Sequence, residues 1–224
     1  MDEEMQIKRD FNEIASLDEE ALWNHNNCYF PSLLKHIPRG ARAALDIGCG
    51  KGELSALLAQ RVQRVTAVDF ADQMITCARA RHAEANIDYI NSNIMTIPFP
   101  DGAFDIIIST ATAHHLPFDW LLDFAKNKLR AGGTLILLDL VQAETFADHL
   151  FWDSAVIVNL FMNLIKNGRF QQHDARAAAL WQRHGERDHY LTLREVRAIS
   201  ARHLPGASVR RNLFWRYTLI WNKP

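Results

Sequence analysis

The chain has few of the features that would mark a secreted or a nucleic-acid-binding protein. It contains only three cysteines among 224 residues. They stand in unrelated contexts, which argues against a disulfide framework and favours a reducing compartment. The formal net charge is −1, so no strong field would attract the chain to nucleic acid. We therefore expect a cytoplasmic protein that does not bind nucleic acid.

Long apolar runs, targeting signals and internal repeats are also missing. The longest apolar run, Ser154 to Ile165, is interrupted by Asn159 and Asn163. It is shorter than the about twenty residues that a helix needs to cross a bilayer. The acidic start, Met1 to Glu4, lacks the basic-then-apolar order of a signal peptide. We expect no membrane span, and the length suits one α/β domain with a cap.

The most informative segment that is present is Ala44 to Glu53, with the sequence ALDIGCGKGE. It follows an apolar run and precedes the apolar segment Leu54 to Ala59, so the pattern predicts a strand, a turn and a helix. Gly48, Gly50 and Gly52 fall in the turn. Glycine permits positive φ and lets a ligand approach the backbone closely. Such a unit forms a nucleotide cradle at the carboxyl end of a parallel sheet.

Two acids near these glycines favour S-adenosylmethionine over a dinucleotide. The dinucleotide pattern GxGxxG would place its third glycine at position 53, where this chain has Glu53. Asp46, two residues before the first glycine, would repel a pyrophosphate but not a cation. S-adenosylmethionine carries a sulfonium and an ammonium and no phosphate. A nicotinamide-dependent dehydrogenase is therefore the disfavoured rival.

The rest of the chain continues the α/β pattern. Arg64 to Asp69 is a short apolar strand ending in an acid, which in such folds accepts hydrogen bonds from ribose hydroxyls. Phe70 follows and could pack on the adenine ring. The pattern further predicts a helix over Asp72–Arg81, strands over Ile87–Asn93, Phe104–Ser109 and Thr134–Asp139, and a helix from near Asp119 that ends at Gly132-Gly133. A capping box, Thr192 to Glu195, predicts a last helix that ends near Pro205-Gly206, followed by strands over Ala207–Arg211 and Phe214–Trp221.

These segments resemble the class I S-adenosylmethionine-dependent methyltransferases, of the small-molecule group (methyltransferase type 11) that includes the quinone-ring methyltransferases. The matching pieces, in order, are Leu45–Gly52, Val68-Asp69, Asn93–Phe99 with Phe104-Asp105, and Leu129–Gly133. The resemblance implies a Rossmann-like seven-stranded sheet with its last strand antiparallel and a helical cap. It also implies transfer of a methyl group from S-adenosylmethionine to an O, N, S or C nucleophile of a small molecule.

The resemblance also implies which residues hold the cofactor. They are Asp46, Gly48, Cys49, Gly50, Asp69, Phe70, Met74, Asn93, Ile94 and Thr110. The family often has Asp where this chain has Asn93, expected to meet the adenine amino group, and an Asn oxygen can still accept that hydrogen bond. Cys49 is expected to contribute its backbone more than its thiol.

We expect one domain over residues 1–224, in four segments. They are an N-terminal arm (1–40), a cofactor-binding core (41–141), a helical cap (142–190) and a last helix with the closing hairpin (191–224). In the cap, apolar residues recur at helical spacing at Phe146, Leu150, Phe151, Ala155, Val158, Phe161, Met162 and Ile165. This stripe either packs on the core or walls an acceptor pocket.

Histidines are the best candidates for proton transfer, because their ordinary pKa lies near neutrality. His114 and His115 follow the fourth strand, and His115 is our first choice for a base at the acceptor. Tyr29, beside His25 in the arm, is the third catalytic candidate. His184 and Asp188 belong to a polar group at the end of the cap that we interpret as solvated charges, so we expect no metal site.

Two alternatives remain at this point. A nucleic-acid methyltransferase is disfavoured, because Ser109 to His115 contains neither the Pro-Pro-aromatic motif of amino-adenine enzymes nor the Pro-Cys motif of cytosine enzymes. A protein that binds S-adenosylmethionine without catalysis is also compatible with the motifs. The motifs identify the methyl donor and leave the acceptor and the oligomeric state open.

Overall fold

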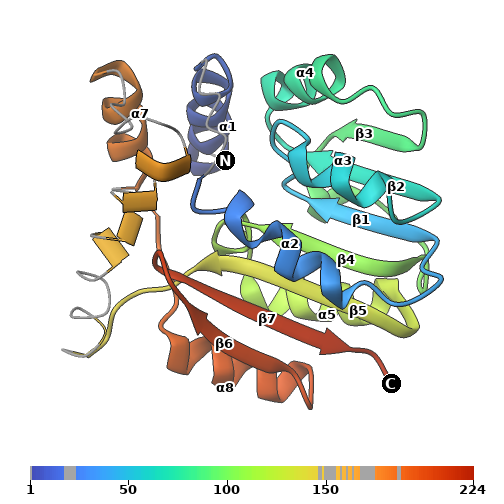
Figure 1. The fold of residues 1–224 in the computed structure, drawn as a ribbon. Helices are drawn as coiled ribbons and strands as arrows, with labels where there is room; N and C mark the ends of the chain where they lie inside the picture. Colours follow the sequence, from blue (N-terminus) through green and yellow to red (C-terminus); the bar gives the residue numbers. More distant parts are fainter. Residues whose placement is uncertain are drawn as a thin grey trace.

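The computed structural model describes residues 2–17, 24–145, 148, 155–156, 158–159, 161–162, 164–166, 175–185 and 188–224. Its centre is a seven-stranded sheet with the strand order β3-β2-β1-β4-β5-β7-β6 (Figure 1). The strands are β1 Ala43–Ile47, β2 Arg64–Asp69, β3 Ile87–Asn91, β4 Phe104–Thr110, β5 Leu129–Leu140, β6 Ser208–Asn212 and β7 Arg216–Asn222. Strands β1 to β5 pair in parallel, and β7 lies antiparallel between β5 and β6. The predicted Rossmann-like sheet with an antiparallel last strand is confirmed.

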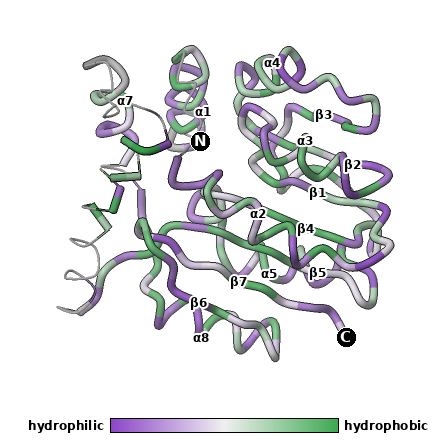
Figure 2. Tube along the Cα trace, viewed as in Figure 1, coloured by the Kyte–Doolittle hydropathy of each residue, from purple (hydrophilic) through white to green (hydrophobic). Residues whose placement is uncertain are grey.

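Helices cover both faces of the sheet because side chains alternate along each buried strand. Leu45 and Ile47 of β1 face the core beneath α5 (Phe118–Lys128) and α8 (Leu193–His203). Ala44 faces the opposite core, beneath α2 (Phe30–Leu33), α3 (Glu53–Ala59) and α4 (Asp72–Arg81). Figure 2 colours much of the central strands hydrophobic, as burial on both faces requires.

Helices α1 (Asp2–Ala15) and α7 (Ala175–Gly185) lie side by side at the carboxyl edge of the sheet (Figure 1). Arg183 of α7 reaches across to α1, with its guanidinium 2.8 Å from Asp10 and 3.1 Å from Glu13. Leu180 of α7 is buried in one cluster with Ile14 of α1. These two helices, from opposite ends of the chain, cover the edge where the parallel strands end.

The predicted capping box of α8 is present. The Glu195 N–H donates to the Thr192 hydroxyl at 3.2 Å, and the Thr192 N–H donates to the Glu195 carboxylate at 2.8 Å. The predicted helix stop at Gly132-Gly133 is wrong, because α5 already ends at Lys128. Both glycines belong to β5, whose pairing with β4 has a register shift here, and their backbones exchange hydrogen bonds with Lys223.

Only part of the predicted apolar stripe in the cap lies in the described chain. Phe146, Leu150 and Phe151 lie outside the described residues. Ala155 is buried against Phe214, whereas the side chains of Phe161 and Ile165 are 63% and 58% exposed. Among the described helices, none is both long and apolar enough to pass through a membrane.

Candidate active site

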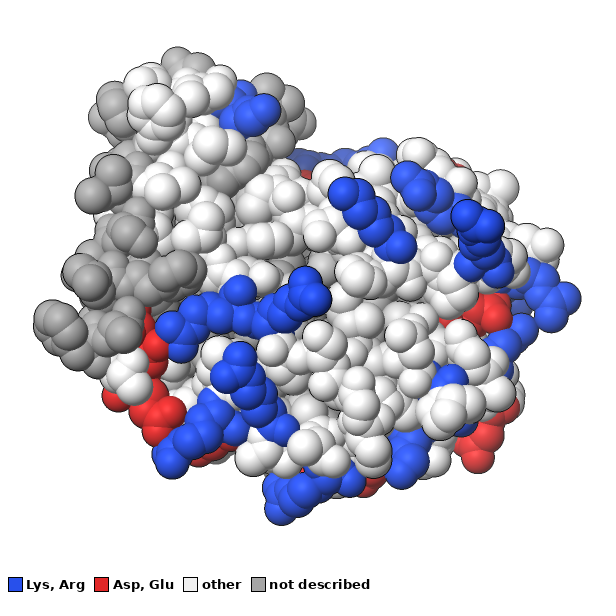
Figure 3. Space-filling model, turned by 60° about the horizontal axis from the view of Figure 1, so that its bottom comes forward, with Lys and Arg blue, Asp and Glu red and all other residues white. Residues whose placement is uncertain are grey.

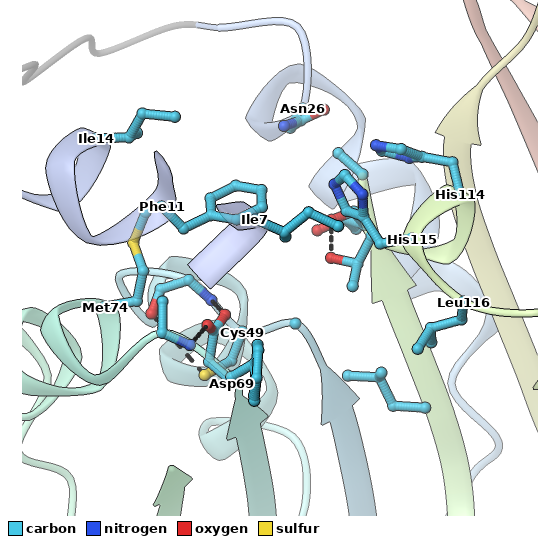
Figure 4. A pocket seen from close by; sticks show the side chains of 18 of the residues that line it. Ile7, Phe11, Ile14, Asn26, Cys49, Asp69, Met74, His114, His115 and Leu116 are labelled. Atoms are coloured by element: carbon cyan, nitrogen blue, oxygen red, sulfur yellow. Dashed lines mark hydrogen bonds between the residues drawn. The ribbon is translucent and has the colours of Figure 1, made fainter. Parts of the chain in front are cut away.

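A cavity of about 650 Å³ opens at the carboxyl edge of β1, β2 and β4, beneath α1 and α7. This volume lies in the range of small-molecule pockets. Figure 4 shows Asp69 and Met74 at one end of the pocket, His114 and His115 at the other, and Phe11 of α1 between them. One pocket therefore contains both groups of predicted site residues.

Every predicted site residue except Tyr29 lines this cavity. Those that line it are Asp46, Gly48, Cys49, Gly50, Asp69, Phe70, Met74, Asn93, Ile94, Thr110, His114 and His115. They come from the ends of β1, β2 and β4 and from the segments that directly follow strands. Parallel strands bring their carboxyl ends to one edge, which is why residues far apart in the sequence meet here.

Two positions in the turn after β1 need glycine, each for a different reason. Gly48 and Gly50 both adopt positive φ, +70° and +52°. A Cβ on Gly48 would lie 2.1 Å from the Thr112 hydroxyl, so this glycine makes room for packing within the protein. A Cβ on Gly50 would meet nothing within 4 Å. Gly50 therefore presents bare backbone to the cavity, as a ligand cradle requires.

Asp46 supplies an unpaired buried acceptor beside this turn. Its side chain is buried, and the Ser55 hydroxyl donates to Oδ2 at 2.6 Å. Oδ1 has no hydrogen-bond partner among the described residues. Burial raises the pKa of Asp46 to about 7, and the charge of Asp69 adds to this effect. A buried carboxylate with one free oxygen suits a cationic ligand group such as an ammonium.

Asp69, at the end of β2, ties the turn to the next helix. Its Oδ2 accepts a hydrogen bond from the Gly50 N–H at 2.8 Å, and its Oδ1 accepts one from the Ala71 N–H at 2.9 Å. Burial raises its pKa, although these N–H donors act in the opposite direction. A carboxylate has about four lone-pair sites. Asp69 can therefore support the turn and still accept hydrogen bonds from a ligand.

Helix α1 covers the residues predicted to meet the adenine. The Lys8 ammonium lies 5.3 Å from the centre of the Phe70 ring. Asn93 donates from its amide to Glu4 at 3.0 Å and accepts at Oδ1 from the Met95 N–H at 2.9 Å. The first half of α1 carried no functional signal in the sequence, yet it forms one wall of the site.

Cys49 lines the cavity as a protonated thiol. Burial, together with the charges of Asp46 and Asp69, holds its pKa well above the usual range. That its backbone matters more than its sulfur stays a prediction. Met74 and Ile94, both 6% exposed, supply apolar wall beside it.

The two histidines at the far end of the pocket differ in basicity. Nδ1 of His114 lies 2.7 Å from Oδ1 of Asp139, at the end of β5. Burial alone would lower the pKa of His114, but Asp139 outweighs it and raises the pKa. Burial and the neighbouring His114 lower the pKa of His115 to about 3. His115, our first choice for a base, is therefore the weaker proton acceptor of the two.

The structure does not bring Tyr29 into the pocket. Its hydroxyl donates to the Leu213 carbonyl at 2.8 Å, and its ring packs near Ala155 and Phe214. Nor do the described residues between 155 and 166 line the cavity. The part of the cavity wall expected from that segment is formed by Trp181 and His184 of α7 and by Asp188, just beyond the helix.

Comparisons with known proteins agree with this architecture. Residues 45–137 match the protein family described as a methyltransferase domain. An uncharacterized methyltransferase of Mycobacterium bovis is 32% identical over 203 residues, which cover 90% of this chain and 98% of that protein. A demethylmenaquinone methyltransferase of Bacillus licheniformis is 28% identical over 60% of this chain and 58% of its own length.

Among solved structures, the geranyl diphosphate C-methyltransferase of Streptomyces coelicolor has the same fold. It was solved in complex with Mg²⁺, geranyl diphosphate and S-adenosyl-L-homocysteine. The TM-score is 0.67, at 14% identity over 98% of this chain and 97% of that one. The glycine turn, the acids at the ends of β1 and β2, and the M. bovis methyltransferase that matches along nearly its whole length all lead to the same family. The chain belongs to the class I S-adenosylmethionine-dependent methyltransferases.

Proposed function

We propose that this enzyme transfers the sulfonium methyl group of S-adenosylmethionine to a small-molecule acceptor bound in the same cavity. The observation that carries the proposal is the continuity of the pocket. Its glycine-turn end has the groups a cationic nucleoside cofactor needs, and its other end holds buried histidines and apolar side chains. A small-molecule site is typically such an apolar pocket with a few convergent polar groups.

The chain's own residues provide the cofactor site. The bare backbone at Gly50 admits the ligand, Asp46 offers a free carboxylate oxygen to its ammonium, and Asp69 offers lone pairs to its ribose. Phe70 and Asn93 would flank the adenine. The bound cofactor supplies an electrophilic methyl group, so the protein must mainly align donor and acceptor and exclude water.

The acceptor would lie between α1, α7 and the loop after β4. Ile7 and Phe11 of α1, with Trp181 of α7, give this end apolar and aromatic surface. The histidines there can receive the proton of an O–H, N–H or S–H acceptor. A sequence relative named for demethylmenaquinone, a small molecule, supports the class of acceptor.

A nucleic-acid acceptor is less well supported. On the face shown in Figure 3, the Lys and Arg side chains stand in separate groups among uncharged and acidic residues. The formal net charge of the chain is −1. Nucleic-acid sites instead concentrate basic residues along the path of the phosphates. The three cysteines are free in the structure, which is consistent with the cytoplasmic location that we propose.

The test uses S-adenosylmethionine labelled in the methyl group and a cell extract divided into small molecules, nucleic acids and proteins. We expect label to enter the small-molecule fraction, and the labelled compound then identifies the acceptor. Label confined to nucleic acid or protein would refute the proposal. Tight binding of S-adenosylhomocysteine with no transfer to any fraction would favour the non-catalytic alternative.

A matched pair of variants tests the cradle: Gly50→Val changes the site, and Gly40→Val is its control. Both glycines have positive φ and open space where a Cβ would project, but only Gly50 lines the cavity. The backbone strain is therefore similar in the two variants. Transfer should be lost in Gly50→Val and kept in Gly40→Val.

A further inference from the structure

Four potential metal ligands meet at the acceptor end of the cavity. His114 and His115 lie in the short helix η4 (Ala113–His115) after β4, His184 lies in the last turn of α7, and Asp188 follows that helix. One donor atom from each lies within 4.8 Å of the donor atoms of the other three. Their side chains are only 6–11% exposed. Figure 4 shows the rings of His114 and His115 close together at this end.

The distances are too long for hydrogen bonds and close to those between ligands of one ion. Nε2 of His114 and Nδ1 of His115 each lie 3.8 Å from an Asp188 oxygen, and Nε2 of His184 lies 3.6 Å away. A good N–H···O hydrogen bond measures about 2.7–3.2 Å. Two ligands on a tetrahedral Zn²⁺, each about 2.0–2.1 Å from the ion, stand about 3.3–3.4 Å apart. A small inward shift of the side chains would therefore complete a coordination sphere.

An outer carboxylate orients the ring of His114. Asp139 holds Nδ1 of His114 at 2.7 Å, so Nε2 of that ring faces Asp188. For His184 the nearest outer carboxylate is Asp10, 3.8 Å from Nδ1, and Nε2 of that ring also faces Asp188. A ligating histidine almost always has such a carboxylate or carbonyl on its other nitrogen, which fixes the tautomer.

The ring of His115 also has one buried nitrogen, Nε2, without a hydrogen-bond partner among the described residues. The nitrogen that faces Asp188 is Nδ1. A flip of the ring, which exchanges the two nitrogens, would bring the unpartnered one to the ion.

We propose that His114, His115, His184 and Asp188 bind one divalent transition-metal cation of the Zn²⁺ class. Three imidazoles and one carboxylate suit such an ion, whereas Mg²⁺ and Ca²⁺ prefer sites made of oxygen ligands. The ion would connect α7 to the loop after β4 across the cavity. This inference concerns the four side chains only and does not depend on the methyl acceptor proposed above.

The ion also has a chemical consequence, which does rest on the proposed function. A cation held by these four side chains would have to take an oxygen or sulfur atom of the acceptor as a fifth ligand, and it would then lower the pKa of that atom. The acceptor's proton would leave to solvent, because Nε2 of His114 would be a ligand and not the base that it can be in the metal-free site.

The test measures Zn²⁺ binding to untagged, full-length protein that has been treated with a chelator. The variants are His184→Gln, Asp188→Asn and, as a control, His189→Gln. His189 is exposed, next to the site in sequence, and not one of the four ligands. We expect one Zn²⁺ per chain, with no comparable binding of Mg²⁺, in the wild type and in the His189 variant. Stoichiometric binding should be lost in the other two variants.

Thermal melting and the Zn²⁺ affinity of one more variant test the site independently of the stoichiometry. Zn²⁺ should raise the melting temperature of the wild type but not of His184→Gln, because a ligand that binds the folded state stabilises it. Asp139→Asn, which alters only an outer partner, should weaken Zn²⁺ binding by roughly 10–100-fold. Absence of Zn²⁺ binding in the wild type, or equal binding in His184→Gln, would overturn the proposal. S-adenosylhomocysteine binding to the metal-free protein shows that each variant folds, and it tests the cofactor site separately.

Discussion

Cofactor affinity should depend on pH through Asp46. Burial raises the pKa of this carboxyl to about 7 in the free protein. Below that pH the group is mostly protonated and cannot pair with an ammonium, so a ligand that needs the carboxylate must first displace a proton. Affinity for S-adenosylhomocysteine, which carries the same ammonium, should therefore fall as the pH falls through 7.

The size of the effect follows from linkage. For a single group with a pKa near 7, the observed Kd exceeds its high-pH limit about twofold at pH 7 and about tenfold at pH 6. The same argument predicts that about one proton is released per ligand bound at pH 6 and almost none at pH 8. Titration calorimetry at pH 6, 7 and 8, in buffers of different ionisation enthalpy, measures both quantities.

The control is Asp46→Asn, which keeps the size of the side chain and the hydrogen bond to Ser55 but cannot titrate. It should bind more weakly than the wild type at pH 8 and show little change in affinity between pH 6 and pH 8. His114 also lies in the cavity and has a shifted pKa, so it could contribute a pH dependence of its own. If the wild-type slope persists in Asp46→Asn, or if the wild type shows no slope, the assignment of Asp46 to the ammonium is wrong.

Three further outcomes are expected. Gly50→Val should weaken S-adenosylhomocysteine binding by more than about tenfold, since a branched side chain would enter ligand space, whereas calorimetry on Gly40→Val should give a nearly unchanged Kd. Asp69→Asn should weaken cofactor binding by roughly 1.5–3 kcal/mol per charged hydrogen bond lost. It should also lower the melting temperature, because Asp69 accepts hydrogen bonds from two backbone N–H groups. An unchanged Kd would show that Asp69 does not belong to the cofactor site. Thr192→Ala should lower the free energy of unfolding by about 0.5–2 kcal/mol through loss of the cap, measured by denaturant titration, and equal stability would show that the capping box contributes nothing.

The cofactor half of the fold could be predicted because its signals are local. The turn after β1 needs glycines at fixed offsets, and β2 ends in Asp69 directly after an apolar run. Each signal lies within about ten residues of the strand that positions it, and a parallel sheet then brings the strand ends together. The prediction that a helix ends at Gly132-Gly133 was wrong because the local signal there is ambiguous. A glycine pair marks a bulge in a strand as readily as the end of a helix, and only the pairing with Lys223 distinguishes the two.

The acceptor half depends on contacts between residues far apart in the sequence. Asp10 and Arg183 are separated by 173 positions and meet because α1 and α7 pack together over the edge of the sheet. No local pattern indicates that pairing. Tyr29 was chosen for its chemistry and its place in the arm, yet its hydroxyl is engaged by the Leu213 carbonyl, away from the pocket.

Asp139 shows where the sequence held a signal that the prediction did not use. It ends the apolar run of β5 in the way that Asp69 ends the run of β2, so it too had to lie at the carboxyl edge. The first acid supports the glycine turn, and the second supports His114. A rule that treats every acid at the end of a buried parallel strand as a site residue would have found both. It would also have paired His114 with a carboxylate, and an oriented imidazole of that kind is what a metal ligand requires.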